Sequence, residues 1–174
     1  RTASSRGGSA LYNFGTVRIS DCRLWSNVAS DLDAGAVHNR GHMTMTGCVL
    51  EENEADNLAG AVINWGGALT IRESVITGIA SNDSGGGIVN FLKGMLRVED
   101  TTVALNTARS GGGIQNSSGG SVTLLGCTLH SNEVTTDGGG ILNLGTLKLT
   151  TCTVSGNTAD RSGGGLYHSS GTAT

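Results

Sequence analysis

The stretch GGGILNLGTLKLTTCTVSGNTA, residues 138–159, combines a glycine block, two asparagines and a run of alternating apolar side chains. Versions of its opening block return every 25 to 27 residues, at 34–37, 59–62, 85–88, 111–114 and 163–166, and a degenerate version stands at 8–11. A fixed period of this length is typical of proteins that stack one small unit on the next. We therefore expect a chain built from about six to seven copies of one unit.

Each copy carries asparagine at two fixed places. The first column contains Asn13, Asn39, Asn64, Asn90, Asn116 and Asn143, with His168 at the same place in the last copy. The second contains Asn27, Asn53, Asn106, Asn132 and Asn157, with Ile79 in the third copy. Asparagine tolerates the left-handed backbone of a sharp corner, and stacked amides can hydrogen-bond to one another. We predict that both columns are structural ladders; the functional alternative for so many asparagines is sugar binding.

The residues between the asparagines predict short strands. Apolar and polar residues alternate after the first asparagine, as at Leu147 and Leu149, and this period of two indicates a strand with one buried face. A second short strand follows, with inward positions such as Cys152 and Val154. Three strands of about four residues cannot bury their own apolar face, so equivalent strands must pair in parallel between copies. The sequence thus predicts an all-β parallel β-solenoid with three short strands per coil.

Residues 1–174 are expected to form a single β-helix domain. Its first coil, 1–33, is degenerate, and its last, 163–174, is incomplete. Both features predict a segment of a longer repeat array, because uncovered strand edges recruit other chains. The expected partners are further coils of the same parent chain or copies of this chain stacked end to end.

Composition excludes several other classes of protein. The chain has 29 glycines without a three-residue period and no proline, which excludes collagen. No run of 18 apolar residues occurs, so no membrane span is expected. The net charge is −3 and no cluster of basic residues occurs, so the sequence does not predict binding to nucleic acid.

The unit at residues 138–159 resembles the repeat of right-handed parallel β-helix proteins of the pectate-lyase-like superfamily. It is most similar to the repeats of polymorphic outer membrane proteins and large bacterial surface proteins, which pair a glycine-rich block ending in isoleucine with a downstream asparagine. This resemblance implies a right-handed β-helix at the bacterial cell surface or outside the cell. It favours a non-catalytic structural or adhesive stalk, with glycans or other surface proteins as candidate partners.

The same superfamily also contains enzymes, so an alternative stays open. The alternative is a carbohydrate-active enzyme, either a polysaccharide lyase or a glycoside hydrolase, or a polysaccharide-binding module. Counting along the repeats places Glu73 and Asp100 in one column on adjacent coils, with Glu99 and Arg97 close by. Paired carboxylates can act as acid and base. The competing interpretation is an exposed ion pair between Arg72 and Glu99.

A second cluster of carboxylates is a candidate calcium site. Glu51, Glu52, Glu54 and Asp56 form an acidic corner on one coil. Carboxylate oxygens are ligands for Ca²⁺, although the spacing is that of neither an EF-hand nor the nonapeptide repeat. A solvated acidic corner is the competing interpretation, and no cofactor other than Ca²⁺ is expected.

The four cysteines form two stacked pairs, Cys22 with Cys48 and Cys127 with Cys152. Stacked residues project their Cβ atoms in parallel about one coil apart, which is wider than the roughly 3.8 Å that a disulfide prefers. We therefore expect buried free thiols that pack as small apolar groups.

Overall fold

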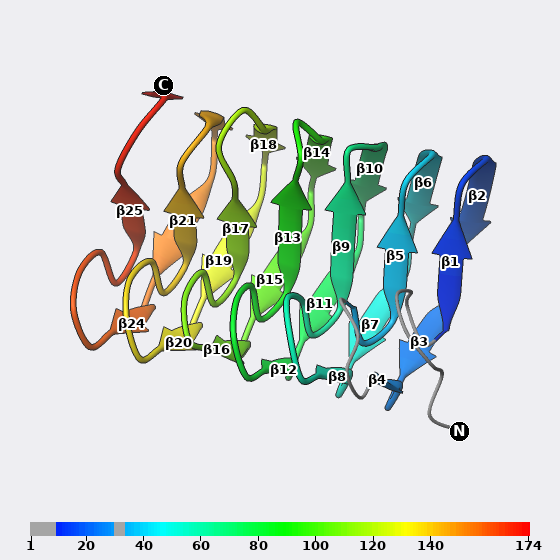
Figure 1. The fold of residues 1–174 in the computed structure, drawn as a ribbon, viewed down its shortest axis with the longest axis horizontal. Helices are drawn as coiled ribbons and strands as arrows, with labels where there is room; N and C mark the ends of the chain where they lie inside the picture. Colours follow the sequence, from blue (N-terminus) through cyan, green and yellow to red (C-terminus); the bar gives the residue numbers. More distant parts are fainter. Residues whose placement is uncertain (1–9, 30–33) are drawn as a thin grey trace.

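The chain winds into a right-handed parallel β-solenoid of about six turns in the computed structural model, which describes residues 10–29 and 34–174. Successive turns lie side by side along the longest axis of the molecule, and the described residues contain no helix (Figure 1). Strands from equivalent positions of successive turns pair in parallel and form four sheets along the described length of the solenoid. The predicted all-β parallel β-helix is confirmed.

The four sheets follow one another around each turn. Sheet 1 consists of β1 (Leu11–Asn13), β5 (Val37–Asn39), β9 (Val62–Trp65), β13 (Ile88–Phe91), β17 (Ile114–Asn116), β21 (Ile141–Asn143) and β25 (Leu166–His168). Sheet 2 consists of β2 (Thr16–Ser20), β6 (His42–Thr46), β10 (Ala68–Arg72), β14 (Met95–Glu99), β18 (Ser121–Leu125), β22 (Thr146–Thr150) and β26 (Thr172–Ala173). Sheet 3 consists of β3 (Arg23–Trp25), β7 (Val49–Glu51), β11 (Val75–Thr77), β15 (Thr102–Ala104), β19 (Thr128–His130) and β23 (Thr153–Ser155). Sheet 4 consists of β4 (Val28–Ala29), β8 (Glu54–Ala55), β12 (Ala80–Ser81), β16 (Thr107–Ala108), β20 (Glu133–Val134) and β24 (Thr158–Ala159).

Sheet 4 is the difference from the three strands per coil that the sequence predicts. Its strands are two residues long, with one residue outward and one inward, as in exposed Glu54 and buried Ala55. Two residues are too few to show an alternating pattern, so the sequence gives no strand signal there. Sheets 2 and 3 coincide with the two strands that the sequence predicts by residue, and sheet 1 supplies the third strand of each coil.

The register between turns places like residues over one another. Ile71 pairs with Val98, which in turn pairs with Leu124, and all three side chains are fully buried in the core. The core is therefore a set of apolar columns that run parallel to the solenoid axis. Its aliphatic side chains come mainly from the inward positions of sheets 1, 2 and 3.

The glycine blocks allow close approach where the chain enters sheet 1. A Cβ atom on Gly113 would lie 2.6 Å from the carbonyl oxygen of Gly140, and a Cβ atom on Gly140 would lie 2.5 Å from that of Gly165. Such distances exclude any side chain. The first residue of the block, Gly138, also has a φ of 73°, in the left-handed region. Ala36 and Ala61 occupy the equivalent position in two earlier turns, so this position must be glycine only in the turns that pack this closely.

The first asparagine column forms a continuous ladder inside the solenoid. Each amide nitrogen donates to the side-chain oxygen one turn later, in the order Asn13, Asn39, Asn64, Asn90, Asn116, Asn143, at distances of 2.7–2.9 Å. The last amide nitrogen lies 2.9 Å from Nδ1 of His168. The ladder therefore has one polarity from its first asparagine to its histidine.

The second column forms a ladder in two parts. In the first part, Asn27 donates to Asn53 at 2.8 Å. In the second, Asn106 donates to Asn132 at 2.9 Å, and Asn132 donates to Asn157 at 2.8 Å. At the interruption, the backbone N–H of Ile79 donates to the side-chain oxygen of Asn106 at 3.1 Å. The isoleucine side chain is buried, so an apolar contact replaces the amide in this turn.

Replacing Asn90 with alanine should destabilise the solenoid strongly. The change removes the acceptor of Asn64 and the donor to Asn116, both buried. Unpaired buried polar groups should lower the free energy of unfolding by roughly 2–4 kcal/mol. Asn82→Ala is the matched control, because Asn82 is exposed and should cost less than about 0.5 kcal/mol. Urea denaturation measures both; equal losses would contradict a stabilising role for the ladder.

Candidate functional site

The candidate carboxylates Glu73 and Asp100 lie at the corner between sheets 2 and 3. Arg72 pairs with Glu99 in register, so the residues that follow them occupy one column on adjacent turns. Both carboxylate side chains are exposed. Their backbone φ values, 49° and 45°, are in the left-handed region.

The whole corner column shares this conformation. Its φ values lie between 45° and 63° for Asp21, Gly47, Glu73, Asp100, Gly126 and Thr151. Glycine adopts such angles at no steric cost, and aspartate is the next most tolerant type. The carboxylate of Asp100 extends over the next turn, because a Cβ on Gly126 would lie 2.3 Å from its Oδ1. The corner conformation thus accounts for Gly47, Gly126, Asp21 and Asp100 in this column, but it does not favour Glu73 or Thr151.

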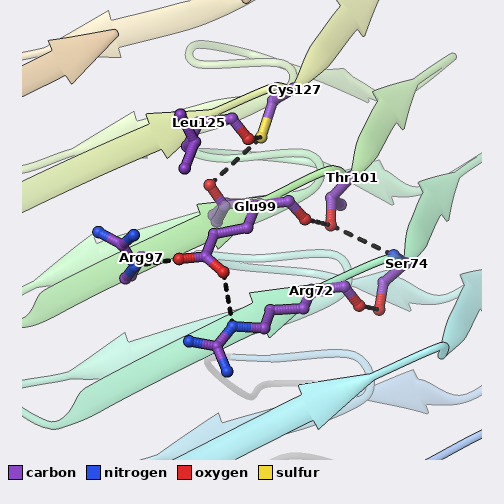
Figure 2. Close-up of polar contacts among 8 residues, drawn as sticks. Arg72, Ser74, Arg97, Glu99, Thr101, Leu125 and Cys127 are labelled. Atoms are coloured by element: carbon purple, nitrogen blue, oxygen red, sulfur yellow. Dashed lines mark hydrogen bonds and ion pairs between the residues drawn. The ribbon is translucent and has the colours of Figure 1, made fainter. Parts of the chain in front are cut away.

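Glu99 lies between two arginines on the outer face of sheet 2 (Figure 2). Arg72 Nε is 2.6 Å from Glu99 Oε2, and Arg97 Nε contacts Glu99 Oε1. Partial burial opposes ionisation of Glu99, but the hydrogen bonds from Arg97 and Arg72 outweigh it and hold the pKa of its carboxyl below the usual value. A general acid of glycoside hydrolysis needs a raised pKa instead. The geometry therefore supports the ion-pair interpretation for Glu99.

The cysteine column belongs to a ladder of short hydrogen-bond donors just after this corner (Figure 2). Ser74 Oγ donates to the carbonyl of Arg72 at 2.6 Å, and Thr101 Oγ1 donates to that of Glu99 at 2.7 Å. Cysteines make the equivalent S–H contact two residues back, from Cys22, Cys48, Cys127 and Cys152 at 3.1–3.4 Å. These side chains therefore satisfy the backbone carbonyl oxygens at the ends of the sheet 2 strands, where the chain turns the corner.

All four cysteines are free thiols, and their burial varies. Cys48 and Cys127 are buried, Cys152 is partly buried and Cys22 is exposed. Cys22 differs from the expected burial because, among the described residues, its neighbouring strand β3 pairs with β7 alone. Burial also raises the pKa of the Cys127 thiol, which keeps it protonated as a donor.

The residues of the acidic corner do not face a common point. Glu51 pairs with Arg23, and Glu52 accepts a hydrogen bond from Trp25 Nε1 at 2.7 Å. Asp56 accepts one from Asn82 at 3.3 Å, and Glu54 is exposed on sheet 4. Across residues 10–29 and 34–174, no three histidine, cysteine, aspartate or glutamate side chains are arranged to hold a metal ion.

A strip of aromatic rings on the outer side of sheet 1 was missed by the sequence analysis. Four of the chain's six aromatic residues lie in it. The ring centroids of Phe14 and Tyr12 are 4.7 Å apart, and Tyr12 stacks on His38 at 4.5 Å. His38 stacks on Trp65 at 5.8 Å, and Trp65 lies 4.8 Å from Phe91. The signal was present in the register, because these residues occupy two adjacent outward columns.

His38 is the strongly perturbed titratable group of this strip. It is fully buried, and Arg40 Nε lies 3.3 Å from its Nε2. Desolvation and then the positive charge of Arg40 lower the pKa of His38 from 6.5 to about 4. The Arg40 guanidinium also lies 5.0 Å above the Trp65 ring. His38 is thus a neutral stacking residue at physiological pH.

These observations define the class of the protein, a parallel β-helix built from stacked repeats with axial hydrogen-bond ladders. The chain belongs to the family described as right handed beta helix region, which matches residues 10–174. Searches of curated proteins and of solved structures each found no match. The described residues contain no helix of the length and apolarity needed to cross a membrane. Membership in a fold family specifies architecture and leaves activity open.

Stability should fall in mild acid because of His38. Its pKa is lower in the folded state, so between pH 6.5 and about 4 the unfolded chain takes up a proton that the folded chain does not. The free energy of unfolding should drop through this window by about 3 kcal/mol and lose nothing further from this group below it. The variant His38→Phe, which keeps an aromatic ring, should lack this component in urea denaturation at several pH values. An NMR titration that gives His38 an ordinary pKa would contradict the account.

Proposed function

We propose that the chain is a non-catalytic structural segment of an extracellular bacterial surface protein, in which it forms an elongated, adhesive β-helical stalk. The observation that carries the proposal is the ladder from Asn13 to His168. In this ladder, buried polar side chains form hydrogen bonds that join each turn to the next along the axis. That use suits a protein whose task is to keep its length and shape.

The rest of the hydrogen-bonding supports the same role. In addition to the ladder bond, Asn90 donates to the carbonyl of Gly94 at 2.8 Å within its own turn. Asn132 and Asn157 each donate to a backbone carbonyl of the preceding turn, at 3.0 Å. Side-chain amides therefore tie strands and corners together as well as linking turns. Such a rod resists local opening, which proteases require.

The enzyme alternative rests on Glu73 and Asp100, which are exposed on adjacent turns. The left-handed corner explains Asp100 without catalysis, because aspartate tolerates that backbone, whereas it does not itself favour Glu73. The lowered pKa of the nearby Glu99 also argues against a proton donor in this cluster. The stalk is accordingly the function that the geometry supports best.

Incubation of the chain with polyuronates or neutral glycans, with or without Ca²⁺, should release no unsaturated or reducing ends. No products are expected because the candidate catalytic carboxylates are Glu99, which is paired with Arg72, and the two corner residues Glu73 and Asp100. Absorbance of unsaturated products and a reducing-end assay measure the outcome. Turnover that disappears in Glu73→Gln/Asp100→Asn would replace the stalk with a lyase or hydrolase.

The structural role itself predicts protease resistance in the native state. Trypsin should cut the folded chain far more slowly than a variant with a broken ladder, such as Asn90→Ala, at equal concentrations.

Antibodies against the chain should label intact, unpermeabilised cells of the source bacterium if the stalk is at the surface. Labelling that needs permeabilised cells would contradict the surface location while leaving the stalk architecture intact.

A further inference from the structure

The hydrogen-bond donors at the corner between sheets 2 and 3 contain sulfur only in adjacent pairs. In turn order these donors are Cys22, Cys48, Ser74, Thr101, Cys127 and Cys152. Ser74 Oγ makes the same contact as the cysteines, with the carbonyl oxygen two residues back, at 2.6 Å. A hydroxyl is therefore enough for the corner, so the corner alone does not explain why cysteines stand on neighbouring turns.

Cys22 and Cys48 lie one turn apart in the same column. Arg23 pairs in parallel with Val49, and the backbone N–H of Val49 donates to the carbonyl oxygen of Cys22 at 2.9 Å. Each thiol contacts the carbonyl oxygen two residues before it, at 3.1 Å for Cys22 and 3.4 Å for Cys48. The two side chains thus point the same way, and their sulfur atoms are separated by about 4.8 Å, the spacing of neighbouring parallel strands.

That separation suits a metal ion between the sulfur atoms better than a bond that joins them. A disulfide holds its sulfurs about 2 Å apart and its Cβ atoms roughly 3.8 Å apart. Metal–thiolate bonds are about 2.3 Å long, so an ion midway between two sulfurs needs them about 4.6 Å apart. Soft monovalent cations such as Cu(I) favour thiolates and accept two ligands in a line. In the described part of the chain, no three histidine, cysteine, aspartate or glutamate side chains come together, so an ion that needs two ligands is the kind that fits.

The pair is open to solvent on one side. Cys22 is exposed, whereas Cys48 is fully buried and packs in the main core. A cation can therefore reach the Cys22 sulfur directly, and the core holds the second sulfur in place. Asp21 adds negative charge nearby, because its carboxylate extends over the next turn, where a Cβ on Gly47 would lie 2.5 Å from its Oδ1. Since Gly47 precedes Cys48, this carboxylate attracts cations to the pair.

We propose that Cys22 and Cys48 together bind one soft monovalent cation, of the class to which Cu(I) and Ag(I) belong. The cation forms one bond to each sulfur and takes the place of both thiol protons, which pass to water. Neither the sulfurs nor the metal change oxidation state. The bound group carries one net negative charge, which water can stabilise on the exposed side at Cys22. This site goes beyond the stalk role and does not depend on it.

The second stacked pair is a poorer site. Cys127 and Cys152 are in register, since Thr128 pairs with Thr153, but Cys127 is buried and Cys152 is partly buried. Burial also raises the pKa of the Cys127 thiol, which opposes the loss of a proton that metal binding requires. Cys22 and Cys48 are therefore the pair that binds the cation.

The test uses the chain with Cys127→Ser/Cys152→Ser, which keeps Cys22 and Cys48 as its two cysteines. The matched control carries Cys48→Ser in addition and keeps one exposed thiol. Serine makes the same corner bond at Ser74, so both chains should fold, and thermal melting checks this. Cu(I) and Ag(I) are each titrated without oxygen against a competing chelator, with Zn(II) for comparison. Proton release and light scattering are followed in the same titrations.

The two-cysteine chain should bind one cation, release two protons and show no association of chains. Its affinity for Cu(I) and Ag(I) should exceed that of the control by about a hundredfold or more, because the second thiolate is already in place. Zn(II), which takes four ligands, should bind both chains equally weakly. The proposal is overturned if the two chains bind Cu(I) and Ag(I) equally, if the cation bridges two chains, or if Zn(II) shows the same preference for the two-cysteine chain.

A second comparison applies if serine at position 127 or 152 prevents folding. The unchanged chain should then bind one cation more than Cys22→Ser, whose substitution lies at an exposed position. An equal number of bound cations in these two chains would overturn the proposal.

Discussion

The buried amide ladder is the interaction on which the rest of the structure depends. An asparagine such as Asn90 has no water to bond inside the solenoid, so its side chain must meet Asn64 and Asn116 on the adjoining turns. If these amide groups were buried without partners, the loss in folding free energy would exceed the gain from most single apolar contacts. The ladder therefore admits one alignment of each turn on the next, and a shift of one residue would break it.

That alignment turns every position of the repeat into a column. The left-handed corner at Glu73 and Asp100, the S–H and O–H donors at Ser74 and Cys127, and the glycines at the entry to sheet 1 all repeat because the turns are in register. Outward columns then become surfaces whose chemistry is summed along the axis. The outer face of sheet 2 is such a surface, because Arg18 and Arg97 are distant in sequence and belong to one column.

Most of the architecture could be predicted from sequence because the repeat period reports the register directly. Counting from one glycine block to the next placed Arg72 opposite Glu99, and the strands pair in that way. It could not reveal that Arg97, on the same strand as Glu99, also contacts that carboxylate, because the contact depends on side-chain conformation. The aromatic strip around Trp65 was missed for a related reason. It is formed by outward side chains, whereas periodicity reports mainly the inward ones.

Hydrogen exchange of the asparagine side chains tests the central claim most directly. The account predicts that the side-chain amide protons of Asn64, Asn90 and Asn116 exchange only when the solenoid unfolds, because they are fully buried and bonded between turns. Residue-resolved NMR in heavy water measures their rates beside those of exposed Asn82. Protection close to the global free energy of unfolding is the expected result. Exchange as rapid as that of Asn82 would show that the ladder does not hold the turns together.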